Sequence, residues 1–247
     1  MTNLVDVSEF KFPAGTTDVT HLFAQCSSLT SLPDDFVIPD HVINLDGLFL
    51  GTGLESLPAS FKLPPNATIL SATFGSCKLT SLPDGFTLPS KAVTTSYLFS
   101  QTPLKELPST FRLPEGLENC GAMFESCTNL VSLPAGFTIP AKVTESRNMF
   151  YQCTSLVALP EGFAFADSSV LKNVAGMFSG CLSLTTLPAS LDLRGVPSTC
   201  EGLNSMFSVG SPCSTYVVGG DLTKLAIAGN DAASYWIANY KRTLVTD

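Results

Sequence analysis

Charged residues are scarce in this chain of 247 residues. They make up only 14% of the sequence, only 13 residues are Lys or Arg, and the net charge is −8. Proteins that bind nucleic acid present a basic surface that neutralises phosphates. The shortage of cations therefore argues against a nucleic-acid partner.

Long apolar runs are also missing. No stretch of 18 apolar residues is present, which argues against insertion into a membrane. Residues 1–6 have neither the basic region nor the apolar core of a signal peptide. We therefore expect either that a leader was removed from the chain or that the protein is not exported by that route.

Side chains typical of catalytic and metal sites are few. The sequence has two His residues and no Cys-x-x-Cys pair, which gives a zinc site little support. It has no glycine-rich phosphate-binding motif, and no Ser, Cys or Asp nucleophile has a recognisable base partner. We therefore expect no enzyme, no cofactor and no metal ion.

The dominant feature of the chain is a repeat. Leu-x-x-Leu-Pro occurs seven times, and each copy follows a Phe by five or six residues. These anchor Phe residues are 25 to 28 residues apart, at Phe23, Phe49, Phe74, Phe99, Phe124, Phe150 and Phe178. Such a period predicts a solenoid of about seven to eight rungs of 25–29 residues, in which each repeat buries its apolar face against its neighbours.

Two segments of each unit favour short parallel strands. One is Leu-x-x-Leu. The other is Phe-x-[Leu/Ile], which alternates inward and outward as a strand does and is followed by Pro in five of the seven units. The stretch before each anchor Phe is compatible with a helical turn or with irregular structure, and the sequence does not decide between them.

A second period of about 50 residues lies within the first. Units two and four have Thr at a position where units one, three and five have Cys26, Cys77 and Cys127. The same two units place Lys62 and Arg112 at one position. We expect these cations on one face, two rungs or about 10 Å apart.

The chain divides into two predicted parts. Residues 1–210 form the repeat array, with a partial unit at 1–22, and residues 211–247 form a C-terminal strand and helix cap that covers the last rung. The predicted strand is 222–227, and the helix would place on one face Ala233, Trp236, Ile237, Tyr240 and Leu244. Docking of this helix to a partner is the alternative.

Most cysteines are explained as core residues. Five of the eight occupy the repeat position that also accepts Thr, which indicates a small buried side chain, at Cys26, Cys77, Cys127, Cys153 and Cys181. Cys200 and Cys213 lie outside this column and are the best candidates for a disulfide.

The segments Met123–Cys127, Met149–Pro160 and Met177–Cys181 carry a family resemblance. Their pattern, Met-Phe-x-x-Cys-x-x-Leu-x-x-Leu, is similar to the BspA-type leucine-rich repeat and covers roughly residues 10–207. The resemblance implies a β-rich, right-handed leucine-rich-repeat coil. It also implies a non-enzymatic binding surface, since members are mostly surface proteins of bacteria and some protozoa, associated with adhesion, and similar modules occur in virion proteins.

The candidate ligand-binding residues are those that point outward from the rungs. Row one contains Val37, Lys62, Thr87, Arg112, Thr138 and Ala164. Row two contains Thr30, Glu55, Thr80, Lys105, Val131, Val157 and Thr185. The alternative is that rows rich in Thr reflect strand propensity alone.

Two functions fit these features. The first is an adhesin-like recognition module, on the cell surface or secreted, that binds a protein or glycan through one face of the solenoid. The second is a structural component of a larger assembly, such as a virion fibre or decoration protein, with an assembly contact through residues 211–247.

Overall fold

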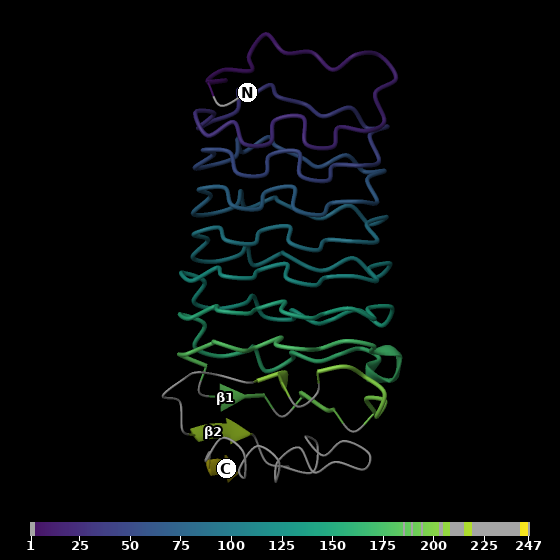
Figure 1. Cartoon of the computed structure of the whole chain (residues 1–247), viewed down its shortest axis with the longest axis vertical. Coiled ribbons are helices and arrows are strands. Elements are labelled where there is room, and N and C mark those ends of the chain that lie inside the picture. Colours follow the sequence, from purple (N-terminus) through teal and green to yellow (C-terminus); the bar gives the residue numbers. More distant parts are fainter. Residues whose placement is uncertain are drawn as a thin grey trace.

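The computed structural model describes residues 3–184, 186–188, 190–193, 195–202, 205–207, 215–218 and 243–246. The chain winds into coils that stack along one axis (Figure 1). Parallel bridges join equivalent positions of successive coils, from Asp18 through Asn44, Ile69, Thr94, Asn119, Glu145 and Asn173 to Glu201. Each step along this series is one repeat of the sequence.

Each coil has three sides. The anchor side runs from six residues before each anchor Phe to two residues after it. The Leu side consists of the Leu-x-x-Leu segments, and the groove side consists of the Phe-x-[Leu/Ile] segments. The three sides differ in how their main chains are bonded to the next coil.

The anchor side carries a ladder of hydrogen bonds in which four bonds at each boundary point the same way; at its start, two bonds point the other way, as from Ile43 and Asn44 to Thr17. Between the coils of Phe74 and Phe99, four N–H groups donate to four carbonyls of the following coil: Leu70 to Thr94, Ala72 to Ser96, Phe74 to Leu98, and Ser76 to Ser100. The same four bonds recur at all six boundaries from the coil of Phe23 to the coil of Phe178. This ladder fixes the register of the stack.

Local turns explain how the anchor side reaches this geometry. Five residues before several anchors, a side-chain oxygen accepts a hydrogen bond from the main-chain N–H two residues later, at Asp18, Asn44, Thr94, Asn119 and Asn173. Such turns are typical of Asp and Asn and are formed more weakly by Thr. The stretch before each anchor Phe, which the sequence did not assign, therefore consists of turns that follow the bridge residue of each coil.

Left-handed residues complete the anchor side. The residues two before and two after each anchor Phe have positive φ, as at His21 (53°) and Gln25 (61°) around Phe23. Most of these positions hold residues other than Gly, although this conformation costs an L-residue roughly 1–2 kcal/mol. The four ladder bonds at each boundary hold the backbone in this conformation.

Two columns of Phe rings run through the core, among buried Leu, Ile, Val, Met and Cys side chains. Successive anchor rings stack with centroids 5.2–5.8 Å apart. The rings of the groove side form a second column, in which Phe86, Phe111, Phe137 and Phe163 stack 6.3–6.4 Å apart. Rings of the two columns also meet edge-on, as Phe111 and Phe124 do, and such aromatic pairs add about 0.5–1.5 kcal/mol each beyond area burial.

Regular elements are short. The 3-10 helix η1 (Ser168–Val170) is capped by Asp167. Strands β1 (Thr186–Leu187), β2 (Thr215–Val218) and β3 (Thr243–Thr246) form a parallel sheet in the order β1-β2-β3. β1 belongs to the Leu side of the seventh unit, so β2 and β3 extend that side beyond the last repeat.

The predicted C-terminal helix is wrong at one residue that the structure describes. Leu244, which the sequence placed on a helix, lies in β3, where it pairs with Tyr216. The expected strand 222–227, Cys213 and the remaining residues of the expected helix lie outside the described residues.

Gly51 provides a test of the left-handed positions. Its φ is 67°, and an added Cβ would come within 2.6 Å of the Gln25 side chain. We expect Gly51→Ala to lower the free energy of unfolding by about 1–2 kcal/mol. Gly85→Ala is the control, because Gly85 is not left-handed and its Cβ would contact nothing. Urea unfolding measures both, and equal effects would contradict this role for Gly51.

Candidate ligand-binding face

A groove of about 620 Å³ opens on the groove side of the first three units. Its walls include Phe36, Phe61 and Leu88 from the core and Pro64 and Pro89 at the ends of the segments. Val37, Lys62 and Thr87, three consecutive members of row one, also line it. The groove therefore joins outward residues that are about 25 positions apart in sequence.

The groove is open because the coils are not bonded to each other there. Among the described residues, the N–H groups of Val37, Lys62 and Thr87 have no hydrogen-bond partner. Among the residues that the structure describes, a parallel bridge forms on this side at one boundary, between Ile139 and Phe165. The strand predicted for every Phe-x-[Leu/Ile] segment is thus paired at that boundary alone.

Proline explains why only that boundary is bridged. The N–H of Ala166 donates to the carbonyl of Ile139 at 2.8 Å. Ala166 occupies the position that Pro39, Pro64, Pro89 and Pro140 hold in other units, and Pro has no N–H to donate. Proline at this position therefore removes the cross-coil bond, and the polar main chain stays open to the groove.

The rings of the groove side are more widely spaced than the anchor rings, and the spacing is the same at the bridged boundary, where Phe137 and Phe163 lie 6.3 Å apart. Ring spacings there are 6.3–6.4 Å, against 5.5–5.8 Å for the anchor rings of the same coils. Two coils on this side thus rise about 13 Å. The separation of about 10 Å expected between Lys62 and Arg112 stays a prediction, and the ring spacing of the neighbouring coils favours a larger value of about 13 Å.

Row one is exposed along its length. Val37 is 70% exposed, Lys62, Thr87, Arg112 and Thr138 are exposed, and Ala164 is half-buried. The Arg112 guanidinium donates to the carbonyls of Ser109 and Phe111, which holds it against its own coil. Lys62 forms no ion pair with any described residue.

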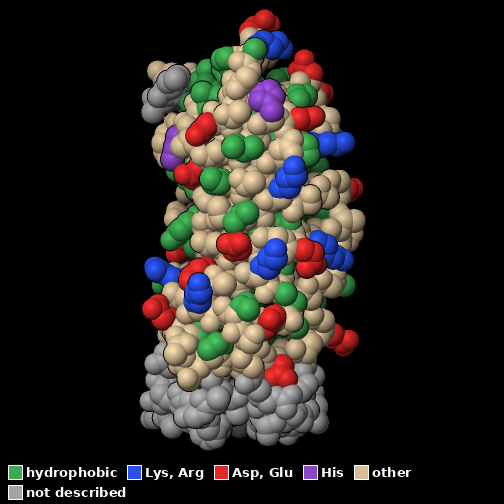
Figure 2. All heavy atoms as spheres, turned by 90° about the vertical axis from the view of Figure 1, so that its right-hand side faces the viewer, with side chains coloured by type: hydrophobic (Ala, Val, Ile, Leu, Met, Phe, Trp, Pro, Cys, Tyr) green, Lys and Arg blue, Asp and Glu red, His purple; other side chains and the backbone are tan. Residues whose placement is uncertain are grey.

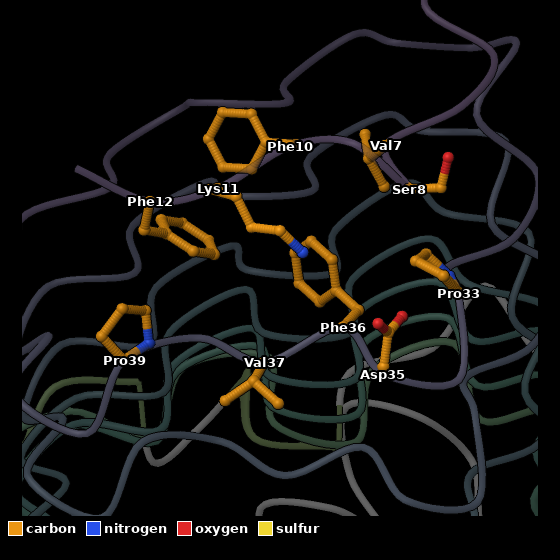
Figure 3. A pocket seen from close by; sticks show the side chains of 10 residues that line it. All are labelled: Val7, Ser8, Phe10, Lys11, Phe12, Pro33, Asp35, Phe36, Val37 and Pro39. Carbon is orange, nitrogen blue, oxygen red and sulfur yellow. The ribbon is translucent and has the colours of Figure 1, made fainter.

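A second pocket extends the groove toward the N-terminus. It has a volume of about 210 Å³ and shares Phe36 and Val37 with the larger groove. Figure 3 shows Lys11 extending across this pocket from the partial unit. Lys11 was missed as a member of row one, although Phe10-Lys11-Phe12-Pro13 repeats the groove-side pattern and could have revealed it.

Row two lies on the Leu side and is bonded along its length. The N–H of each member donates to the carbonyl of the member before it, from Glu55 and Thr30 through Thr80, Lys105 and Val131 to Val157. The members from Thr30 to Val157 are exposed, whereas Thr185 lies outside the described residues. Row two therefore offers side chains only, because its main-chain N–H groups are already paired.

The cysteine column is buried and satisfies core carbonyls. The thiols of Cys77, Cys127, Cys153 and Cys181 each donate to the carbonyl of the anchor Phe one coil earlier, at 3.0–3.1 Å. Burial raises the pKa of Cys77 and Cys127 from 9.0 to about 11, so both stay protonated near neutral pH. Thiolate is the nucleophilic and metal-binding form, so these residues are unsuited to either role. Cys200 is also a free, buried thiol, whereas Cys213 is not described.

Other chemistry finds no site in the described part of the chain. No cluster of His, Cys, Asp and Glu there could hold a metal ion, and no helix there is long and apolar enough to cross a membrane. Figure 2 shows a face on which charges of both signs are scattered among uncharged polar groups. The groove, at about 620 Å³ against about 210 Å³ for the pocket beside it, is therefore the candidate site.

Ala166 tests the effect of proline on the groove side. We expect Ala166→Pro to remove the bond to Ile139 and lower the free energy of unfolding by about 1–3 kcal/mol. Ala141→Pro is the matched control, because Pro65 already occupies the equivalent position of unit two. Its effect should stay within about 0.5 kcal/mol. If urea unfolding gives the same stability for both variants, proline does not decide the bonding of this side.

The chain matches no protein-family model and no curated protein. The resemblance to BspA-type repeats therefore stays a prediction, and the case for a function depends on the groove, row one and row two.

Proposed function

We propose that the protein is a non-enzymatic recognition module built as a leucine-rich-repeat solenoid, and that it binds a protein or glycan through its groove side. The observation that carries this proposal is the groove of about 620 Å³, which collects exposed side chains and unpaired main-chain groups from three coils. Its volume lies in the range of pockets that hold ligands. We also propose that the protein acts at the cell surface or as a secreted protein.

The contrast between the three sides supports this choice. The anchor side and the Leu side use their main-chain groups in bonds between coils, whereas the groove side leaves them free. Free N–H and C=O groups on a rigid scaffold give a ligand directional partners without reorganisation of the protein. Row two is the weaker candidate, because it lines neither the large groove nor the pocket beside it.

Binding to arrays of matrix proteins and glycans tests the proposal. We expect the wild-type chain to bind one class and Thr87→Arg, which fills the groove, to lose at least about tenfold in affinity. Thr80→Arg adds the same side chain to row two and should bind as the wild type does. Loss of affinity in Thr80→Arg with Thr87→Arg unaffected would place binding on the Leu side instead, and binding by neither array would contradict recognition of these classes.

A second candidate function, a component of a larger assembly, is favoured by the N-terminal end of the anchor side. The ladder leaves four carbonyls of the first coil without a main-chain donor, those of Asp18, Thr20, Leu22 and Ala24. The partial unit supplies Phe10 against Phe23 but no donor to these carbonyls. The same edge has the N–H groups of Thr17 and Asp18, whose equivalents Ile43 and Asn44 donate to the preceding coil. Such an edge suits a further coil whose N–H groups face the four carbonyls.

Sedimentation velocity over a wide concentration range tests this second candidate. We expect concentration-dependent end-to-end association, which Thr20→Arg at the edge should weaken and Thr80→Arg, away from it, should not. A monomer at every concentration would exclude self-assembly through this edge.

A further inference from the structure

The cations of the groove side recur with a period of two coils. Lys11, Lys62 and Arg112 occupy equivalent positions of alternate units, 51 and 50 residues apart in the chain. All three are exposed, and no acidic residue occupies row one between Lys11 and Ala164, whereas the equivalent position of the seventh unit holds Asp192. At the matching positions of row two, the same duplication carries opposite charges, Glu55 and Lys105. The regular row of cations is therefore specific to the groove side.

These cations lack partners on a protein that carries a net charge of −8. Lys11 and Lys62 form no ion pair with any residue that the structure describes, and Arg112 donates only to main-chain carbonyls. Their charge is therefore available to a ligand. Acidic groups flank the row near Val37, where Asp35 lines the pocket and Asp40 lines the groove. A negative ligand group is thus attracted at the cations and repelled between them.

The spacing of the cations matches an extended polypeptide. Two coils rise about 13 Å on the groove side. An extended chain rises 3.2–3.4 Å per residue, so four residues span roughly 13 Å. Residues four apart in an extended chain also point to the same side. Acidic side chains at every fourth position would therefore meet successive cations of the row.

The surface of the groove favours a peptide over a sugar chain. Its exposed apolar parts are aliphatic, from Val37 and Pro65, whereas Pro64, Pro89 and the aromatic rings of Phe36 and Phe61 are buried. An exposed aromatic face, which commonly stacks on sugar rings, is not among the residues that line the groove. Unpaired N–H groups at Lys62 and Thr87 suit the carbonyls of a peptide main chain.

We propose that the groove side binds an extended acidic peptide whose carboxylates recur at every fourth residue, paired with Lys11, Lys62 and Arg112. The aliphatic side chains between the carboxylates would lie over Val37 and Pro65. This inference rests on the proposed function, because it names the ligand class of the same groove.

Fluorescence polarisation with two labelled peptides tests the inference. One peptide carries Glu at every fourth position with Val and Ser between, and the other has the same composition with its Glu residues adjacent. We expect the first to bind at least about tenfold more tightly and its affinity to fall as salt rises. Equal affinity for the two peptides would overturn the inference, because it would show that the cations attract acidic peptides regardless of the spacing of their Glu residues.

Charge-reversal variants locate the binding. The triple variant Lys11→Glu, Lys62→Glu and Arg112→Glu should lose binding of the spaced peptide. The matched control Lys78→Glu, Arg147→Glu and Lys172→Glu has the same net charge and changes exposed cations outside both rows, so it should retain most of the affinity. Circular dichroism and urea unfolding confirm that both variants are folded. Equal loss in the two variants would overturn the inference.

Two further outcomes separate this inference from the function on which it rests. If neither peptide binds and an array ligand still depends on Thr87, the peptide class is wrong and the recognition function stands. If a sulfated or carboxylated glycan binds and depends on Lys62 while the spaced peptide does not, the occupant is a glycan and the peptide is excluded.

Discussion

The hydrogen-bond ladder of the anchor side is the interaction on which the rest of the structure depends. Its four bonds at each boundary set the register of the coils, hold the left-handed residues around each anchor Phe and bring the anchor rings into stacking distance. Because every bond of this group points the same way along the stack, the ladder also has unlike ends. The first coil presents acceptors, and this is what gives the assembly hypothesis its physical basis.

On the groove side, proline removes the main-chain hydrogen bonds between coils that the anchor side has. Where Pro ends the Phe-x-[Leu/Ile] segment, its missing N–H prevents the bond that Ala166 donates to Ile139, while the Phe rings stack at the same spacing with or without that bond. One residue type thus leaves the core intact and frees the main chain at the surface. The same stack is therefore closed on two sides and open on the third, which is the property expected of a rigid binding surface.

The period, the core and the outward rows could be predicted from the sequence, because like positions recur and each repeat can bury its apolar residues only against the next. The buried Cys column and the exposure of Lys62 and Arg112 follow the same logic. The turns of the anchor side could not, because their left-handed residues include Ala, Ser, Gln and Tyr, which carry no turn signal. The groove was missed because Pro was understood as the end of a strand, whereas its larger effect is on the neighbouring coil. Lys11 was missed because it lies in a partial unit.

Amide hydrogen exchange resolved to single residues tests the central claim that the anchor side is bonded and the groove side is open. We expect the N–H groups of Phe74, Phe99 and Phe124, which donate to the next coil, to be protected by several orders of magnitude. The N–H groups of Lys62, Thr87 and Arg112 should exchange at rates close to those of an unfolded chain. Similar protection on the two sides, or faster exchange at the anchor residues, would contradict the proposed division of the stack.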